Sequence, residues 1–401
     1  MINLQNSRLL LLLLLGNFSF QLLAADSAPD PFANPPVPAF PGQTAAPRAA
    51  ISDISMEVVY SGIQGSRALE ILPDNTVLIA EGSGKIVLVQ ADGKVSEPLD
   101  GMPVMRAGNG RRLMDLILDA NFDRNRRVFF AYEAPPVTGS EDPVPQIASA
   151  RLSNDNTRFE NVQVLAGLPG RRLASTADGK LYITTIGYME LRPEVQDLLQ
   201  YSGKVLRINA DGSIPQDNPY AGLSNVLPEI YAIGHRDQAG IMLHPQTGEL
   251  WSIEHGPMGG DELNIVRAGQ NAGWPYTSYG KNYDGTEIGP TQWQGVTQPL
   301  YYWFPSLAPS GLIMVQNDLF PGWQGSLLVG SLSPAQGRFL IRLVMDGERV
   351  VAEEHLLVDY DRRIRDMAEA PDGTIYLLTD SENNAEAGRQ FPGELLKILP
   401  N

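Results

Sequence analysis

Short apolar segments separated by polar turns recur along the chain from Ile54 to the C-terminus. Within each segment, apolar residues alternate with polar ones or form a brief run, and Gly, Asn or Asp occupies the turn, which is typical of β-hairpins. Six similar units follow one another at intervals of roughly 50 to 75 residues, a spacing that indicates a repeated sheet. The units are LPDNTVLIAEGSGKIVLV from Leu72, FDRNRRVFFAYE from Phe122, ADGKLYITTIG from Ala177, HPQTGELWSIEHG from His244, FPGWQGSLLVGS from Phe320 and APDGTIYLLTD from Ala370.

These repeats predict an all-β fold, a six-bladed β-propeller. A long β-sandwich or two stacked β domains is the alternative, but the repeats fill the chain without an intervening linker, which favours the propeller. Loops from several blades converge on the central axis of a propeller. A ligand is therefore expected on that axis, and the residues that contact it should be scattered in sequence.

The composition is that of a globular protein with a sizeable core. The chain has 401 residues, of which 43% are hydrophobic and 19% charged. The high content of glycine and proline, 39 and 31 residues, suits many strands joined by turns. The formal net charge of −16 argues against a nucleic-acid partner, because the phosphates would be repelled.

The N-terminus predicts export from the cytoplasm. Residues 1–25 hold one arginine, an unbroken leucine run and then Ala24 and Ala25, which is typical of a cleaved signal peptide. An uncleaved membrane anchor is the alternative, but the apolar run is short for a spanning helix, so no stable membrane insertion is expected after cleavage. Residues 26–50 are rich in Pro and Ala and predict an extended linker, followed by the propeller at 51–401. We expect a periplasmic or secreted protein, which without cysteines must be stabilised by packing alone.

The stretch IEHGPMGGDELN at 253–264 is the first candidate for chemistry. Its glycines allow sharp turns and close approach to a ligand. Its carbonyls and the carboxylates of Glu254, Asp261 and Glu262 are ligands that a hard cation such as calcium prefers. From these residues alone, a calcium site and an acidic surface loop are equally compatible with the pattern.

In its wider context, this stretch resembles the soluble PQQ-dependent aldose sugar dehydrogenases of the glucose/sorbosone dehydrogenase family. GHRDQAG at 234–240, EHGPMGGDELN and GQNAGWP follow the family order, and related pieces extend from about Ser66 to the C-terminus. The resemblance implies a six-bladed propeller that oxidises the C1 hydroxyl of aldose sugars by hydride transfer to calcium-bound PQQ. A sugar substrate and an electron acceptor, whose identities the sequence does not give, would be its partners.

The resemblance also implies a set of cofactor contacts. The backbone carbonyls of Gly256 and Pro257 would hold calcium. Arg236 would contact PQQ, with Asp237 in place of the family's usual asparagine. PQQ carries three carboxylates, for which fixed guanidinium groups are suited.

Two further regions complete the expected cofactor site. Arg363 and Arg365 match a C-terminal arginine pair of the family that clamps the cofactor carboxylates. Because they are two residues apart on a predicted strand, both can face the axis. Asn109 could replace a cofactor-binding glutamine if its loop shifts by one residue.

The chain departs from the family at the position of the catalytic base. Relatives carry a histidine that removes the proton from the C1 hydroxyl, at the start of a stretch like H-F-G-G-R-L. This chain reads LPGRRL at 168–173, so Leu168 stands where the histidine is expected, and leucine cannot accept a proton. All four histidines lie later, at 235, 244, 255 and 355. Glu190, or a water held by Asp237, is a candidate replacement base.

Other changes cluster at the mouth of the expected cofactor site. Arg111, Arg112 and Arg171 replace family glycines, and Tyr188 replaces an acid.

Three functions are therefore compatible with the sequence. The first is a PQQ-dependent dehydrogenase with another base or an unusual substrate. The second is a catalytically impaired propeller that binds calcium and PQQ, or a sugar-like anion such as an acidic sugar, without turnover. The third is a calcium-dependent lactonase-like hydrolase, which would need a cage of side-chain carboxylates on the axis.

Overall fold

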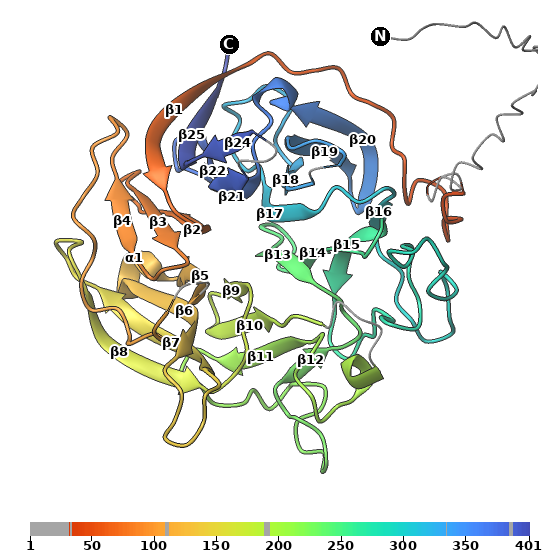
Figure 1. Ribbon diagram of the computed structural model, residues 1–401, viewed down its shortest axis with the longest axis horizontal. Helices are drawn as coiled ribbons and strands as arrows, with labels where there is room; N and C mark the ends of the chain where they lie inside the picture. The colour runs from red at the N-terminus through yellow and green to blue at the C-terminus, as the bar shows by residue number, and fades with distance from the viewer. Residues whose placement is uncertain (1–31, 33, 109–111, 188–192, 334, 385–387) are drawn as a thin grey trace, which may run out of the picture. The chain divides into compact units, whose positions relative to one another are not determined.

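The described strands form antiparallel sheets that radiate as six blades from a central axis (Figure 1). The computed structural model describes residues 32, 34–108, 112–187, 193–333, 335–384 and 388–401. The prediction of an all-β, six-bladed β-propeller is confirmed. No helix among the described residues is long and apolar enough to cross a membrane. The predicted signal peptide at 1–25 lies outside the described residues and stays a prediction.

Each blade except the first has four strands, and the first has three. The blades, in order around the ring, are β2 (Ser66–Ile71), β3 (Val77–Glu81) and β4 (Ile86–Val89); β5 (Leu113–Leu118), β6 (Arg127–Ala134), β7 (Val144–Leu152) and β8 (Phe159–Ala166); β9 (Leu173–Ser175), β10 (Lys180–Thr184), β11 (Val205–Asn209) and β12 (Ile230–Ala232); β13 (Gln238–Leu243), β14 (Leu250–Glu254), β15 (Asp261–Val266) and β16 (Tyr301–Trp303); β17 (Pro309–Met314), β18 (Leu327–Ser331), β19 (Leu340–Asp346) and β20 (Arg349–Leu356); and β21 (Ile364–Glu369), β22 (Ile375–Thr379), β25 (Gly393–Pro400) and β1 (Ile54–Ile63). Outside the blades lie α1 (Phe122–Asn125), the 3-10 turns Pro193–Gln196 and Val358–Tyr360, and the hairpin of β23 (Glu382–Asn384) and β24 (Arg389–Phe391).

The ring closes by pairing the two ends of the propeller within one blade. β1 forms the outer strand beside β25, with Ile54 opposite Pro400 and Ile63 opposite Gly393. The last blade is therefore built from both ends of the chain, so it cannot be completed until nearly the whole sequence is present.

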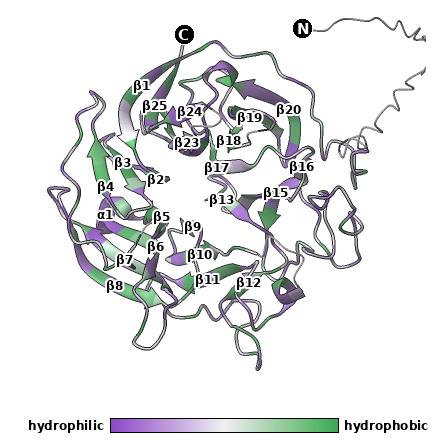
Figure 2. Ribbon diagram, in the orientation of Figure 1, coloured by the Kyte–Doolittle hydropathy of each residue, from purple (hydrophilic) through white to green (hydrophobic). Residues whose placement is uncertain are grey.

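The core lies between neighbouring blades. Each blade packs against a neighbour on both faces, so strands such as β3 and β4 are buried throughout and do not alternate. Their residues are mostly hydrophobic (Figure 2). Phe129 and Ile147 of the second blade, for example, pack with Leu181 of the third. Continuous burial explains why the sequence units contain short, wholly apolar runs.

The innermost strands β2, β5, β9, β13, β17 and β21 surround the axis (Figure 1). Here one guanidinium joins several blades. Arg172, just before β9, pairs with Asp115 of β5 at 3.2 Å and with Asp366 of β21 at 2.7 Å. It also donates to the backbone carbonyl of Arg67 in β2.

Residues 35–50, which we call the strap, lie within the predicted linker 26–50. The strap has little regular structure, as its composition suggests, but it is hydrogen-bonded to the fourth and fifth blades and is not a free tether. Gln43 is fully buried and donates to the Pro299 carbonyl at 2.8 Å. Its side-chain oxygen accepts hydrogen bonds from the Ala39 amide and the Tyr279 hydroxyl, and Arg48 pairs with Glu353 of β20.

We predict that Gln43→Ala lowers the free energy of unfolding by about 2 kcal/mol, because it removes the partner of the Pro299 carbonyl and of the Ala39 amide. Denaturant unfolding of the mature protein measures this. The control is Gln90→Ala at an exposed position, where a change within about 0.5 kcal/mol is expected. Equal effects of the two substitutions would mean that Gln43 does not anchor the strap.

A second prediction concerns Glu70 of β2, which faces the axis. Burial, followed by the charges of Asp366 and Asp115, raises the pKa of Glu70 well above its usual value of 4.5. The folded state therefore holds this proton more tightly than the unfolded chain does. The stability that this group contributes is present below pH 4.5 and is lost as the pH rises towards the folded-state pKa.

Glu70→Gln should accordingly raise the thermal midpoint at pH 8 and change it little at pH 4. Thermal melts across this range test the prediction, with the exposed Glu97→Gln as control. A pH-independent effect of Glu70→Gln would contradict it.

Candidate functional site

The loop between β14 and β15 carries the stretch 253–264 and turns sharply upon itself. A Cβ on Gly256 would lie 2.1 Å from the Gly259 carbonyl oxygen, so no larger residue fits there. Gly260 has a φ of +72°, and a Cβ added there would lie 2.3 Å from the Gly280 amide nitrogen. The glycines thus serve close packing of backbone on backbone.

The carboxylates of this stretch are used inside the fold. Asp261 is fully buried and accepts hydrogen bonds from the backbone amides of Gly256 at 2.9 Å, Leu307 at 2.7 Å and Ala308 at 2.8 Å. It therefore fixes the loop of the fourth blade to the entry of the fifth. Glu254 similarly bonds to Nδ1 of His235 at 2.7 Å. The role of Asp261 as a backbone anchor was not foreseen from the sequence.

Within the described part of the chain, no group of three or more His, Asp or Glu residues is arranged to hold a metal. The lactonase-like alternative, which needs a carboxylate cage, therefore has no support from the described residues.

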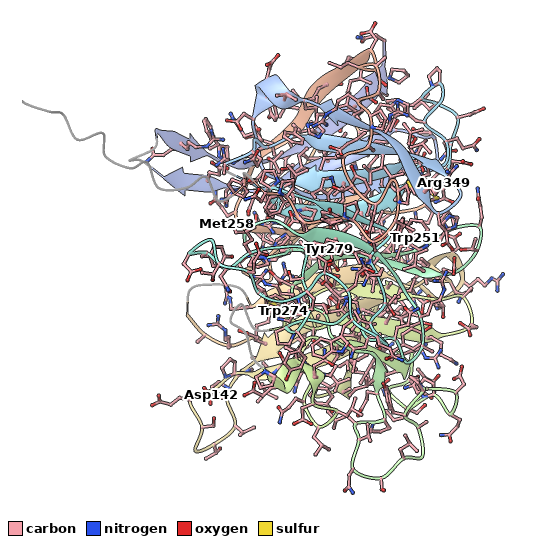
Figure 3. All side chains as sticks on the ribbon, turned by 90° about the vertical axis from the view of Figure 1, so that its right-hand side faces the viewer. Asp142, Trp251, Met258, Trp274, Tyr279 and Arg349 are labelled. Carbon is pink, nitrogen blue, oxygen red and sulfur yellow. The ribbon has the colours of Figure 1, made fainter. Side chains whose placement is uncertain are left out.

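Arg236 lies against the same loop and is only 2% exposed. Its Nη1 donates to the carbonyls of His255 at 2.8 Å and Gly256 at 2.9 Å. Its guanidinium lies 5.2 Å from the centre of the Trp274 ring, and Nε and Nη2 have no hydrogen-bond partner among the described residues. Burial lowers the pKa of Arg236. Figure 3 shows Trp274 and Met258 towards one face of the propeller and Arg349 towards the other.

Asp237 forms an ion pair with Arg171, so its carboxylate is not free to hold a cofactor or a water as the sequence suggested. The pair joins the start of the fourth blade to the loop before the third. His255 lies beside it, with Nδ1 3.3 Å from Asp237 and Nε2 2.8 Å from the Pro309 carbonyl. Burial and then the charge of Arg171 lower the pKa of His255 to about 4, so its ring is neutral at pH 7 and Nε2 donates to Pro309.

The two C-terminal arginines lie in different surroundings. Arg365 pairs with Asp380 at 2.6 Å and lines a small cavity on the axis. Arg363 lies 3.5 Å from Glu382 of β23 and does not line that cavity. The axial cavity has a volume of about 30 Å³ and is lined by Arg67, Met114, Arg171, Arg172, Ala239 and Arg365.

Leu168 is a core residue, only 3% exposed, packed in a cluster with Ala131, Ile147 and Ile183. Arg112 is partly buried, and its Nε has no hydrogen-bond partner among the described residues. The predicted contact Asn109 and the candidate base Glu190 lie outside the described residues. Arg111 and Tyr188 do so as well.

A larger pocket, which we call the side pocket, adjoins the axial cavity between the second and third blades. It has a volume of about 460 Å³, and Met114 lines both spaces. Apolar residues including Pro169 and Ile186 form part of its wall. The polar and aromatic residues of its lining are Tyr132, Glu133, Thr185, Gln200, Tyr201 and Ser202. Sequence motifs gave no signal for this pocket, because its residues belong to separate turns.

The described residues do not fit the cofactor pair that the resemblance implies. Sites for ligands of moderate size usually have about 300–1,000 Å³, and the arginine-lined axial cavity has about 30 Å³. The Gly256 carbonyl, expected to bind calcium, already accepts from the cationic Arg236, which would repel a second cation. Asp237, an expected cofactor contact, is engaged in an ion pair with Arg171.

Comparison with known proteins agrees with the resemblance seen in the sequence. The family model Glucose / Sorbosone dehydrogenase matches residues 63–389. The aldose sugar dehydrogenase YliI of Escherichia coli is 34% identical over 365 residues, covering 88% of this chain and 94% of that protein. Its crystal structure in the apo-form superposes with a TM-score of 0.78, covering 87% of this chain and all of that one.

Two further solved structures are similar. A crystal structure of a glucose dehydrogenase is 36% identical, with a TM-score of 0.76 and coverage of 86% of this chain and 99% of that one. The PQQ-bound aldose sugar dehydrogenase of Streptomyces coelicolor is 22% identical, with a TM-score of 0.65 and coverage of 88% of this chain and all of that one. At that identity the last comparison shows the fold alone.

We predict that Asp237→Asn lowers the free energy of unfolding by about 3 kcal/mol, because it leaves the Arg171 guanidinium without its ionised partner in a mostly buried site. The matched control is Asp346→Asn, which breaks the exposed pair with Arg349 and should cost about 0–1 kcal/mol. Urea unfolding of both variants tests the prediction. A similarly small loss for both would show that the axial pair is open to solvent.

Proposed function

Because the chain belongs to the glucose/sorbosone dehydrogenase family, we propose that it is a sugar-binding member whose aldose sugar dehydrogenase activity is very weak. Family membership supports a sugar-type ligand. The side pocket agrees with it, since it combines aromatic rings with hydroxyl, amide and carboxylate groups. Sugars present both apolar C–H faces and hydroxyl groups, which such a lining can bind. The predicted signal peptide supports action in the periplasm or outside the cell.

The observation that carries the loss of activity is the burial of Leu168 in an apolar cluster. Oxidation at C1 needs a base within reach of the hydroxyl proton. Among the described groups at the mouth of the axial cavity, the Asp237 carboxylate is paired with the Arg171 guanidinium. The neutral His255 has a pKa of about 4, which makes it a weak base.

The residues of the side pocket would bind and orient a sugar. Gln200 and Ser202 offer hydrogen bonds to hydroxyl groups, and the carboxylate of Glu133, which pairs with Arg106 through Oε2, retains Oε1 as an acceptor. The rings of Tyr132 and Tyr201 would pack on the C–H faces.

A calcium- and PQQ-dependent dehydrogenase with ordinary turnover is the second candidate. One observation favours it: Nε and Nη2 of Arg236 are buried without partners, and an anionic cofactor would satisfy them. This candidate requires Arg171 to leave the mouth of the axial cavity, and the test below separates it from the first.

We predict that the mature protein, supplied with PQQ and calcium, oxidises glucose and other common aldoses at least about two to four orders of magnitude more slowly than a family member with the histidine. Losing a general base alone has this cost, and the poor fit of the cofactor adds to it. A dye-acceptor assay beside the Escherichia coli aldose sugar dehydrogenase measures this. Turnover comparable to that enzyme would contradict the proposal.

Variants identify the cause. Leu168→His alone should destabilise the protein without restoring turnover, because the imidazole enters an apolar cluster. Leu168→His combined with Pro169→Phe and Arg171→Gly should raise turnover, because it also restores the family's loop and removes the guanidinium from the mouth. Restoration by the single substitution would show that the mouth is already open to the cofactor.

A further inference from the structure

We propose that the ligand of this site is a sugar acid, whose carboxylate lies in the axial cavity and whose hydroxylated carbon chain lies in the side pocket. This inference rests on the proposed function and specifies its ligand. The geometry points to it because a small cationic space and a larger, mixed polar and aromatic space adjoin each other.

The axial cavity is lined by four arginines from three blades. Arg67 comes from β2, Arg171 and Arg172 precede β9, and Arg365 comes from β21. No carboxylate is among the residues that line this cavity. Asp237, Asp366 and Asp380, which pair with Arg171, Arg172 and Arg365, are not among the lining residues, so the charged groups that border the cavity are cationic.

Pairing with these carboxylates does not exhaust the donors. A guanidinium carries five N–H groups, and a single carboxylate takes at most two. Arg365 shows this directly. Its Nη2 donates to Asp380 at 2.6 Å, while its buried Nε has no partner among the described residues. An anion in the cavity would receive charge-assisted hydrogen bonds from such groups.

The volume of the cavity limits what can enter it. About 30 Å³ accommodates little more than one water-sized group, so a carboxylate fits and a sugar ring does not. The remainder of a ligand must continue into the neighbouring space. The side pocket supplies about 460 Å³ there.

The two spaces share part of their walls. Met114 lines both. Pro169 and Gly170 line the side pocket, and the next two residues, Arg171 and Arg172, line the axial cavity. A ligand carboxylate on the arginines would therefore place its adjoining carbons beside this backbone turn, with Gln200 and Ser202 available to its hydroxyl groups.

The net negative charge of the protein makes the group of arginines on the axis more significant. The protein carries a net charge of −16 and repels anions at long range. The concentration of arginines on the axis is thus a local feature opposed to the general composition. A carboxylate would receive stronger, charge-assisted hydrogen bonds from these arginines than a neutral sugar hydroxyl could.

The test is isothermal titration of the mature protein with gluconate and glucuronate, the neutral isosteres glucitol and glucose, and acetate and phosphate as small anions. We expect the sugar acids to bind at least about tenfold more tightly than their neutral counterparts, which corresponds to about 1.4 kcal/mol.

Variants test the two parts of the site separately. Arg365→Gln should abolish the preference for sugar acids, and Ser202→Ala should weaken binding of acidic and neutral sugars alike. The matched control is Arg349→Gln, which removes the same charge towards the other face (Figure 3) and should change nothing. If Arg365→Gln does not fold, Arg67→Gln serves the same purpose.

Each alternative result has a distinct meaning. Equal affinity for acidic and neutral sugars would overturn the sugar-acid inference and leave the proposed sugar binding intact. Acetate or phosphate binding as tightly as gluconate would also overturn it, because the side pocket would then contribute nothing. Absence of binding by every sugar, in protein shown to be folded by its thermal midpoint, would overturn the inference and the proposed function together.

Discussion

The structure depends on the buried guanidinium of Arg172 at the centre of the ring. Its ion pairs with Asp115 and Asp366 and its hydrogen bond to the Arg67 carbonyl join four blades at the axis. The same carboxylates also accept backbone hydrogen bonds, from Leu173 to Asp115 and from Leu69 to Asp366. Breaking one such pair leaves a buried charge uncompensated, so this network constrains the positions of the innermost strands.

That constraint determines what the mouth can contain. With Arg172 fixed below it, the preceding Arg171 is held at the axis, where it pairs with Asp237. In the fourth blade, Asp261 fixes the glycine-rich loop and thereby the Gly256 carbonyl to which Arg236 donates. The family scaffold is therefore retained, while guanidinium groups border the space on its axis. The side pocket between the second and third blades is the larger space next to this mouth.

The fold could be predicted from the sequence because its signal is repeated. Turns and apolar runs return six times, and each repeat obeys the same local rules. The site was less accessible for a physical reason: its contacts join residues far apart in the chain. Asp261 was read as a candidate cation ligand, yet its oxygens accept backbone amides from residues more than forty positions later. Leu168 was predicted to stand at the position of the family's histidine, and only packing shows that it belongs to the core. The strap was expected to be a tether because composition does not reveal the buried hydrogen bonds of Gln43.

Binding of the family's cofactor is the most direct test of whether arginine side chains close the axial cavity to PQQ. Purified protein lacking the predicted signal peptide would be titrated with PQQ in the presence and absence of calcium, with the quinone absorbance and the thermal midpoint followed together. We predict no saturable, calcium-dependent change in the quinone absorbance or in the thermal midpoint. Stoichiometric binding of PQQ that requires calcium and raises the thermal midpoint would contradict it.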